Sequence, residues 1–243
     1  MPDKNTIYIF DIDGTITQPT QPMDEVIARG LMEWSSDKVI YFATGSEWEK
    51  ASQQLTSEII GSSAGIFCCS GSQFYHKGIE KAELRREWEA PKELEIFFET
   101  KLAESDFLPK VGGHISRRVG MINFSTVGRL ATLEERLKYS KWDAERGERE
   151  GIKREASSLF PHLEFHLGGQ ISIDCYPTGW NKGRVIRDIK GWHPDSRVVF
   201  FGDKLMPGGN DFPIIQELED GDLYFHVRDP NHTLEIIKKL FSN

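Results

Sequence analysis

Apolar residues follow two kinds of pattern along the chain, and each pattern predicts a different element. Four short runs are apolar at nearly every position, at residues 7–10, 38–43, 65–69 and 197–201. This pattern is typical of strands that are buried on both faces in a parallel sheet. Residues 23–34 and 47–55 predict helices, and a last strand at 224–227 precedes a closing helix at 233–241. Both ends of the chain therefore predict a parallel α/β core.

Around residue 80 the character of the chain changes from apolar strands to charged, helical segments. Pro91 is expected to open a helix, because proline fits the first helical position. The expected buried face of this helix consists of Leu94, Ile96, Phe97, Phe98 and Leu102. Thr132 and Glu135 have the spacing of a capping box, so a second helix should begin there and continue to about Leu159.

Two pairs of antiparallel strands complete this middle part of the chain. The first pair is predicted at residues 114–118 and 121–126, and the second at residues 163–167 and 170–176. A Gly168-Gly169 turn joins the second pair. The middle of the chain therefore predicts an α+β arrangement, in contrast to the parallel pattern at its two ends.

The fold class expected from these patterns is α/β. It consists of a Rossmann-like parallel-sheet core with an inserted α+β cap domain, which contains an antiparallel sheet and helices. We assign residues 1–81 and 180–243 to the core and residues 82–179 to the cap.

Length, charge and cysteine content narrow the class of protein. The 243 residues are 38% hydrophobic and 11% aromatic, which suffices for folded cores. A net charge of −8 argues against a general nucleic-acid binder, so local arginines and lysines must bind any anionic ligand. The three cysteines fit neither a disulfide framework nor spaced metal ligands, which favours the reducing cytoplasm. The sequence shows neither a signal-type segment nor an apolar run of membrane-spanning length, so no membrane partner is expected.

The most informative chemistry follows the first apolar run, where Asp11 and Asp13 precede Gly14 and Thr15. Side chains at positions i and i+2 of an extended segment point the same way, so we expect the two carboxylates to converge. Carboxylate oxygens suit Mg²⁺, which also screens an attacking carboxylate from an anionic phosphate. Asp11 is therefore the candidate nucleophile and Asp13 the candidate acid/base. The alternative is a strand that simply ends in an aspartate-rich turn.

Further polar residues follow the other predicted strands and open a helix; they are Thr44, Lys182, Asp203 and Asp211. The carboxyl ends of parallel strands meet at one edge of a sheet, where ligands bind. Phosphoryl transfer through an aspartyl-phosphate requires a hydroxyl donor, a cation and extra carboxylates for Mg²⁺ beside Asp11. Taken singly, Lys182 would be interpreted as a surface lysine and Thr44 as a helix cap.

These motifs resemble the four motifs of the haloacid dehalogenase superfamily. In this chain they are Asp11-x-Asp13-Gly-Thr, Thr44-Gly-Ser, Lys182, and Gly202-Asp203 with Asn210-Asp211. Within that superfamily the chain is most similar to the eukaryotic-type phosphomannomutases. The stretches that carry this resemblance are Phe-Asp-Ile-Asp-Gly-Thr-Ile-Thr, Gly-Met-Ile-Asn-Phe-Ser-Thr-Val-Gly-Arg, Gly-Gly-Gln-Ile-Ser-Ile-Asp and Phe-Phe-Gly-Asp-Lys-Leu-Met-Pro-Gly-Gly-Asn-Asp. They run nearly from end to end, and the last two are highly specific.

The resemblance implies a mutase that interconverts mannose 6-phosphate and mannose 1-phosphate, with Mg²⁺ and a hexose 1,6-bisphosphate as activator. In this interpretation Asp11 takes the phosphoryl group and Asp13 moves the proton. The metal ligands would come from Asp11, the Asp13 carbonyl, Asp203 and Asp211. The residues that would face the core and hold the phosphate that is not transferred are Arg118, Asn123, Arg129, Arg136, Ser172 and Asp174. A homodimer formed through the cap is also implied.

The sequence departs from the family pattern at two positions. Thr20 stands where the family has an arginine shortly after its first motif, and Asn181 stands where it has an aspartate before the lysine. If water replaced the sugar hydroxyl as acceptor, the same residues would make a sugar-phosphate phosphatase, which is the alternative function. A non-catalytic sugar-phosphate binding protein is the third alternative, which the presence of every chemical residue disfavours.

Overall fold

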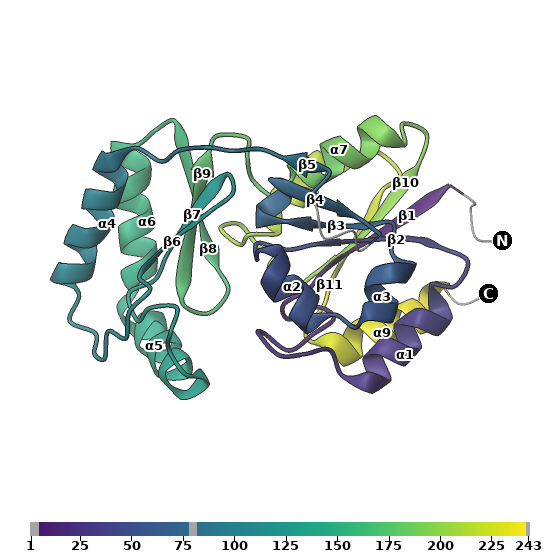
Figure 1. Cartoon of the computed structure of the whole chain (residues 1–243), viewed down its shortest axis with the longest axis horizontal. Helices are drawn as coiled ribbons and strands as arrows, with labels where there is room; N and C mark the ends of the chain where they lie inside the picture. The colour runs from purple at the N-terminus through teal and green to yellow at the C-terminus, as the bar shows by residue number, and fades with distance from the viewer. Residues whose placement is uncertain (1–4, 78–81, 242–243) are drawn as a thin grey trace. The chain divides into compact units, whose positions relative to one another are not determined.

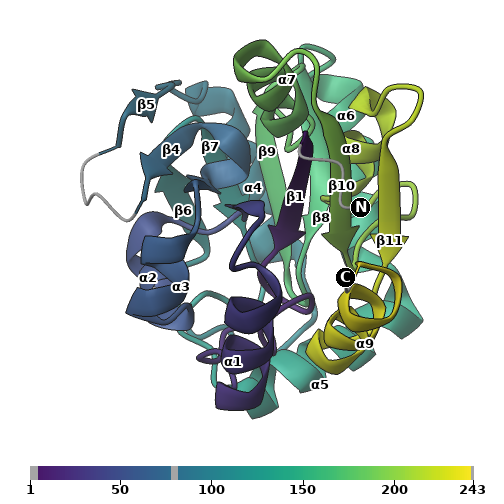
Figure 2. The ribbon, with the colours of Figure 1, turned by 90° about the vertical axis from the view of Figure 1, so that its right-hand side faces the viewer.

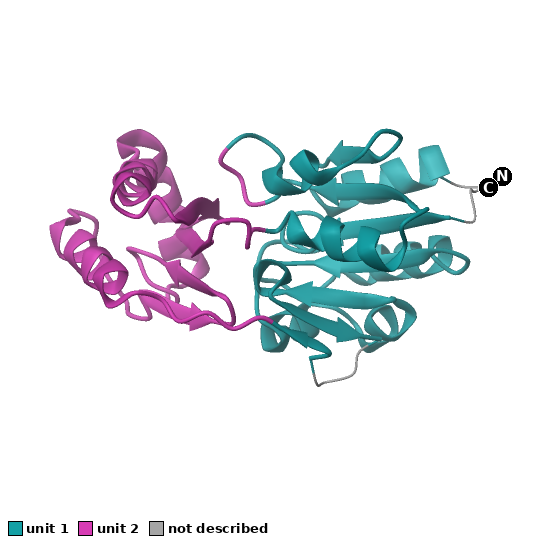
Figure 3. Ribbon diagram, turned by 90° about the horizontal axis from the view of Figure 1, so that it is seen from above, with its two compact units in different colours: residues 1–85, 182–207, 211–243 teal, residues 86–181, 208–210 magenta. Residues whose placement is uncertain are grey.

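A computed structural model describes residues 5–77 and 82–241 of the chain. The chain divides into two compact units (Figure 3). The first unit contains Met1–Arg85, Lys182–Pro207 and Asp211–Asn243, and the second contains Arg86–Asn181 and Gly208–Asn210. The predicted first boundary, at residue 81, lies outside the described residues. Within the described ranges, we find no helix with the length and apolar character needed to cross a membrane.

The first unit contains a seven-stranded sheet in the order β11-β10-β1-β2-β3-β4-β5 (Figure 1). Its strands are β1 (Thr6–Asp11), β2 (Val39–Ala43), β3 (Gly65–Cys68), β4 (Gln73–His76), β5 (Leu84–Arg85), β10 (Arg197–Gly202) and β11 (Leu223–His226). The five strands from β11 to β3 are parallel, and β4 and β5 add to the edge in antiparallel pairing. The predicted fold class is confirmed by this parallel-sheet core together with the separate antiparallel sheet of the second unit.

Helices cover both faces of the first sheet (Figures 1 and 2). They are α1 (Glu25–Trp34), α2 (Trp48–Gln54), α3 (Ser57–Ser62), α7 (Arg184–Trp192), α8 (Phe212–Glu217) and α9 (Pro230–Phe241). Because successive side chains of a strand point to opposite faces, Ile7 and Ile9 of β1 pack toward α7 and α8. Tyr8 packs against Trp34 of α1 and Phe241 of α9 on the other face. The central strand is therefore buried on both sides, as its apolar run predicts.

The second unit is built on a four-stranded antiparallel sheet in the order β6-β7-β9-β8. Its elements are α4 (Lys92–Glu104), β6 (Ile115–Arg118), β7 (Met121–Phe124), α5 (Leu133–Arg146), α6 (Glu148–Leu159), β8 (Leu163–Gly168) and β9 (Ser172–Pro177). Phe98 of α4 and Ile152 of α6 share an apolar core with Phe124 and Ile173 of the sheet. The opposite side chains of these strands, including Asn123, are therefore on the face of the sheet away from this core.

Three expectations for the second unit are wrong or incomplete. The predicted long helix is broken at Gly147, which adopts a φ of +67° and separates α5 from α6. The capping box of Thr132 and Glu135 is confirmed at the start of α5. Ile96 is 60% exposed, so it does not belong to the buried face of α4, which begins after Pro91 rather than at it.

The pattern also missed short elements of the first unit. These are α3, α8 and β5, which contain at most six residues each. The sequence also predicts a hairpin at residues 73–78, and its turn extends to Gly78, which lies outside the described residues. Strand β4 of this segment pairs in antiparallel fashion with both β3 and β5. Segments this short give too few positions to establish a helical or strand period.

Candidate active site

Three carboxylates meet at the carboxyl edge of the first sheet. Asp11 ends β1, Asp203 follows β10, and Asp211 precedes α8. One oxygen from each of these side chains lies within 4.8 Å of the others, and we call this group the carboxylate cluster. The parallel pairing of β1 with β10 explains the proximity, because it brings the ends of both strands to the same edge.

Gly14 permits the turn after β1 to approach this cluster closely. Its φ is +89°, and a Cβ atom on this residue would lie only 2.6 Å from Oδ2 of Asp203. Any other residue would therefore combine a strained backbone with a clash. In the same turn, the hydroxyl of Thr15 donates a hydrogen bond to Oδ2 of Asp11 at 3.3 Å. The Asp-x-Asp-Gly-Thr motif thus places Asp11 beside Asp203 and supplies one donor to it.

Lys182 is the buried cation of the cluster, whereas Lys204, which pairs with Asp203, is partly exposed. Its ammonium donates to Asp11 and, at 2.6 Å, to Oδ1 of Asp211, and its side chain is completely buried. Burial lowers the pKa of Lys182, but Asp11 and Asp211 outweigh burial and raise it overall, so the group remains charged. Burial also raises the pKa of Asp11, and the net shift is well upward although Lys182 opposes it. Asp211 and Asp203 add to that upward shift.

The chemistry of the carboxylate cluster fits a hard divalent cation. Three carboxylates exceed the two ammonium groups that contact them, those of Lys182 and Lys204, and oxygen ligands are those that Mg²⁺ prefers. Burial raises the pKa of Asp203, Asp211 raises it further, and Lys204 only partly opposes them. A cation bound by these oxygens would relieve the repulsion among them. Asp11, Asp203 and Asp211 are therefore the residues that could hold such a metal.

Asp13 does not converge with Asp11, contrary to expectation. Its side chain lies outside the carboxylate cluster and instead accepts hydrogen bonds from the Thr20 amide, Gln54 and Lys50. The strand ends at Asp11, and the amides of residues 15 to 17 turn back to the Ile12 carbonyl, so the alternation of a strand no longer applies. Asp13 can therefore contribute only its main-chain carbonyl as a candidate metal ligand.

The pKa of Asp13 is lowered even though the group is largely buried. Burial raises it, but the charge of Lys50 and the hydrogen bonds from the Thr20 amide and Gln54 outweigh burial. Neither Lys50 nor Gln54 was identified from the sequence. Their four-residue spacing on α2, directly after the Thr44-Gly-Ser turn, places both on one face of the helix and could have indicated them.

Thr44 is buried in the turn that follows β2. Its hydroxyl accepts a hydrogen bond from the amide of Ser46 at 3.0 Å, and its own amide donates to the Phe67 carbonyl at 2.8 Å. Ala43 of the same strand is paired with Asp11, so the turn lies at the same edge of the sheet. Among the described contacts, none joins the Thr44 side chain directly to Asp11.

A second group of predicted residues lies in the second unit, on strands β7 and β9, in the segment that follows β7 and on α5. Asn123 and Asp174 are opposite each other on β7 and β9, and the Asn123 amide donates to Oδ1 of Asp174 at 2.6 Å. Arg129 donates to Oδ1 of Asn123 at 3.2 Å. Arg136 donates to the main-chain carbonyl of Arg129 at 2.8 Å, and so fixes the segment that carries it. These four residues form one connected group, which we call the arginine–amide group.

Ser172 and Arg118 lie in the same unit as the arginine–amide group. The Ser172 hydroxyl donates to the Gly168 carbonyl at 2.8 Å, and Asp174 borders the same glycine. Arg118 ends β6 and is only 9% exposed. Arg149, which was not predicted, donates to the carbonyls of Gly169 and Ser172 and so supports this turn.

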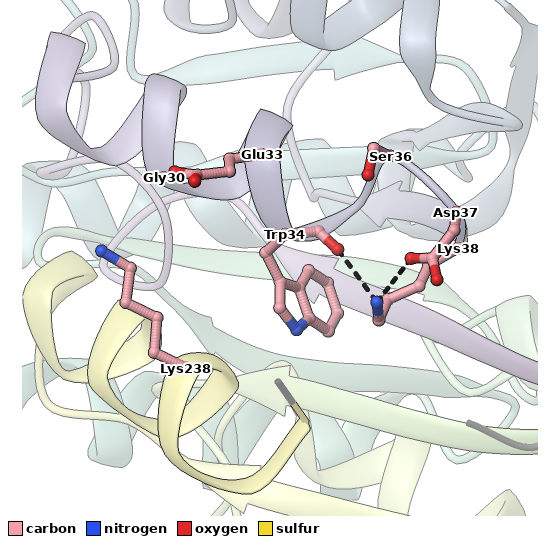
Figure 4. Close-up of a pocket in the computed structure, with 7 residues that line it drawn as sticks. All are labelled: Gly30, Glu33, Trp34, Ser36, Asp37, Lys38 and Lys238. Atoms are coloured by element: carbon pink, nitrogen blue, oxygen red, sulfur yellow. Dashed lines mark hydrogen bonds and ion pairs between the residues drawn. The ribbon is translucent and has the colours of Figure 1, made fainter. Parts of the chain in front are cut away.

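A separate cavity of about 580 Å³ lies between α1 and α9 and contains none of the predicted site residues (Figure 4). Its charged lining residues are of both signs, with Glu33 and Asp37 opposing Lys38 and Lys238. Lys38 is already bonded to Asp37 at 2.6 Å and to the Trp34 carbonyl at 3.0 Å. This cavity therefore lacks the positive character that a phosphate site requires.

The matching family model and the sequence relatives agree with each other. A family model described as eukaryotic phosphomannomutase matches residues 27–243. The phosphomannomutase of Saccharomyces cerevisiae is 31% identical over 245 residues, which cover 98% of this chain and 94% of the relative. That of Encephalitozoon cuniculi is 34% identical over 218 residues, which cover 87% of this chain and 85% of the relative.

Solved structures share the fold at lower identity. The C-terminal domain of Candida albicans trehalose-6-phosphate phosphatase has a TM-score of 0.67 at 15% identity, with 97% of this chain and 91% of that chain covered. An IMP-bound mutant of Plasmodium falciparum IMP-nucleotidase also has a TM-score of 0.67, at 17% identity, with 96% and 65% covered. At these identities the likeness extends to the fold alone.

Proposed function

Because the chain belongs to the eukaryotic phosphomannomutase family, we propose that it interconverts mannose 6-phosphate and mannose 1-phosphate. The observation that carries this proposal within the site is the contact of buried Lys182 with Asp11. A buried ammonium keeps one carboxylate oxygen at a fixed position beside the edge of the sheet. That arrangement is what a nucleophile for phosphorus requires.

Asp11 is the proposed nucleophile. One of its oxygens forms a bond to phosphorus as the bond from phosphorus to the sugar oxygen breaks, which gives an aspartyl-phosphate and a free sugar hydroxyl. Asp13 gives the departing oxygen its proton and later removes a proton from the attacking hydroxyl. A hexose 1,6-bisphosphate would prime Asp11 by giving it a phosphoryl group. When the hexose bisphosphate returns to the enzyme in the opposite orientation, its other phosphate is transferred, which moves the phosphate between O1 and O6. Lys182 stays protonated and stabilises the charge on Asp11.

Asp11, Asp203 and Asp211 are the proposed side-chain ligands of Mg²⁺, together with the main-chain carbonyl of Asp13. When bound, Mg²⁺ would neutralise charge on the transferring phosphate and on the attacking carboxylate. The excess of carboxylates over ammonium groups supports this assignment. Thr44 is proposed to donate a hydrogen bond to the transferring phosphate, which its hydroxyl can do while it still accepts from the Ser46 amide.

The second unit is proposed to bind the phosphate that is not transferred. Arg129 and Arg136 of the arginine–amide group supply positive charge in a chain whose net charge is −8. Arg118 adds a third guanidinium, and Asn123, Ser172 and Asp174 offer hydrogen bonds to sugar hydroxyls or phosphate oxygens. Arg118, Asn123, Ser172 and Asp174 are buried, which supports a role in a binding site over that of solvated surface groups.

A homodimer formed through the second unit is also proposed. Leu130, before α5, and Leu133 and Leu137, in its first turns, are 75%, 54% and 52% exposed and could supply apolar area to such an interface. A cytoplasmic location is proposed because Cys68, Cys69 and Cys175 are all free thiols. Sedimentation equilibrium tests the first proposal, and cell fractionation tests the second.

A coupled assay tests the proposed function. Purified protein is given mannose 1-phosphate, Mg²⁺ and catalytic hexose 1,6-bisphosphate, and mannose 6-phosphate formation is followed beside the release of inorganic phosphate. We expect isomerisation to exceed hydrolysis, and we expect Asp11→Asn to abolish both. Phosphate release without isomerisation would support the phosphatase instead. Binding of the sugar phosphate without either product would support a non-catalytic binding protein.

A further inference from the structure

The carboxylate of Asp13 is held by three residues of the first unit. The Thr20 amide donates to Oδ1 at 2.7 Å, and Nε2 of Gln54 donates to the same oxygen at 2.9 Å. The ammonium of Lys50 lies 3.4 Å from Oδ1 and 3.1 Å from Oδ2. The side chains of Lys50 and Asp13 are 29% and 27% exposed, so their contact is only partly buried.

The two carboxylate oxygens of Asp13 accept different numbers of hydrogen bonds. Oδ1 has three donors, which exceeds the two lone pairs that a carboxylate oxygen offers. For Oδ2, the contacts of the described residues include only the ammonium of Lys50. Oδ1 therefore serves as the anchor of the side chain. Oδ2 retains capacity for one further hydrogen bond, such as one from a substrate hydroxyl.

Lys50 also connects Asp13 to the turn after β2. Its ammonium donates to Oγ of Ser46 at 3.1 Å, and the Ser46 amide donates to the Thr44 hydroxyl at 3.0 Å. The Asp13 turn and the Thr44 turn follow adjacent strands, and Lys50 links the two through its side chain. Loss of this side chain would release both Oδ2 and the Ser46 hydroxyl, whereas the Thr20 amide and Gln54 would still hold Oδ1.

We propose that Lys50 is a positioning residue for transfer to the sugar, which fixes Oδ2 of Asp13 as the oxygen that exchanges a proton with the substrate hydroxyl. This inference rests on the proposed function, because Asp13 needs a defined reacting oxygen only if it serves a sugar hydroxyl. A displacement of about 1 Å in a catalytic group can cost about 10²-fold in rate. We therefore expect a fall of about 10- to 100-fold in kcat for isomerisation when Lys50 is replaced by methionine.

The experiment separates the two halves of the reaction. With p-nitrophenyl phosphate as donor, the nitrophenolate leaves without needing a proton, so its burst reports phosphorylation of Asp11 alone. Isomerisation of mannose 1-phosphate then reports transfer to and from a sugar hydroxyl. Lys50→Met should keep the burst but show a lower kcat for isomerisation. Lys50→Arg, which retains the positive charge and the hydrogen-bond donors, should recover most of the wild-type kcat. Lys190→Met is the matched control, because Lys190 is ion-paired on the same unit with Asp222 and Glu219.

Each outcome decides a different question. Wild-type kcat in Lys50→Met, in a preparation whose wild type isomerises, would overturn the positioning role and leave the proposed function intact. An equal fall of the burst and of isomerisation, without recovery in Lys50→Arg, would also overturn it, because that result indicates a general structural role. A wild-type protein that gives a burst but no isomerisation would overturn the proposed function, and the inference with it.

Discussion

Replacement of Glu164 by glutamine is expected to destabilise the second unit in a pH-dependent way. The Glu164 carboxylate accepts hydrogen bonds from the amide of Gly179 and from Nδ2 of Asn181, both at 2.7 Å, and it lies 3.3 Å from Nε2 of His166. Burial raises the pKa of this group, but these three contacts outweigh burial and lower the pKa to about 2. Glutamine retains one acceptor oxygen, so it can keep only part of this network.

The magnitude follows from the change in pKa between the unfolded and folded states. A fall from the ordinary value of 4.5 to about 2 corresponds to about 3 kcal/mol of stabilisation by the charged form. Because the side chain is 24% exposed, solvent screening reduces this to about 2 kcal/mol. Because the pKa of Glu164 is lower in the folded state, this stabilisation is fully present above pH 4.5 and is lost as the pH falls toward 2.

Urea-induced unfolding at several pH values measures this contribution. Glu164→Gln should lose about 2 kcal/mol relative to wild type at pH 7, and the difference should fall to less than about half of that by pH 3. Glu150→Gln is the matched control, because Glu150 is 57% exposed and lies 3.5 Å from Lys153, so it should lose less than about 0.5 kcal/mol. A loss for Glu164→Gln that is independent of pH would refute the electrostatic reasoning. A loss no larger than that of the control would refute the role of the hydrogen bonds.

Three further predictions concern the carboxylate cluster and its neighbour. Asp11→Asn should form no acid-stable, base-labile phosphoenzyme, because an amide does not attack phosphorus; labelling with a radioactive hexose bisphosphate checks this. Asp13→Ala should still accept phosphate from p-nitrophenyl phosphate but transfer it to a sugar about 10²–10⁴-fold more slowly in a single-turnover assay. Lys182→Met should lower the unfolding free energy by about 3–5 kcal/mol in urea, because it leaves Asp11 and Asp211 buried without their counter-charge. Wild-type stability in that variant would show that the ion pairs contribute nothing.

The parts of the fold that could be predicted depend on local sequence. The apolar run of β1 gave its position at the centre of the sheet, and the spacing of Thr132 and Glu135 gave the start of α5. The break at Gly147 was missed because its flanks are charged and helix-forming. There the left-handed turn is stabilised by Asp143, whose side chain accepts hydrogen bonds from the amide and guanidinium of Arg149. No local pattern distinguishes such a glycine from one within a continuous helix.

The site shows the same limit at longer range. The proximity of Asp11 to Asp203 follows from the rule that parallel strands end at one edge, so the sequence was sufficient. The direction of the Asp13 side chain depends on Lys50 and Gln54, which are 37 and 41 residues away in the sequence. Strand alternation could not predict it, because the chain has already left the strand at that point.

Thr20 stands where the family has an arginine, and the local geometry allows an arginine to be introduced there without disturbing Asp13. Thr20 has a φ of +66° and an exposed side chain, and it holds Asp13 through its main-chain amide alone. An arginine here would keep that amide, and since arginine is not branched at Cβ it should tolerate the left-handed backbone at least as well as threonine.

A charged hydrogen bond to phosphate contributes about 1.5–3 kcal/mol, so Thr20→Arg should lower the KM for mannose 1-phosphate by about 10- to 100-fold. A sugar phosphate held more firmly leaves less often before it accepts the phosphoryl group, so water should compete less at Asp11. The ratio of isomerisation to phosphate release should therefore rise as well. Thr20→Gln is the control, since it adds a side chain that can donate hydrogen bonds but carries no charge. If both variants gave the wild-type KM and product ratio, another cation of this chain would already fill the role of the family arginine, and the arginine–amide group would be the first place to search for it.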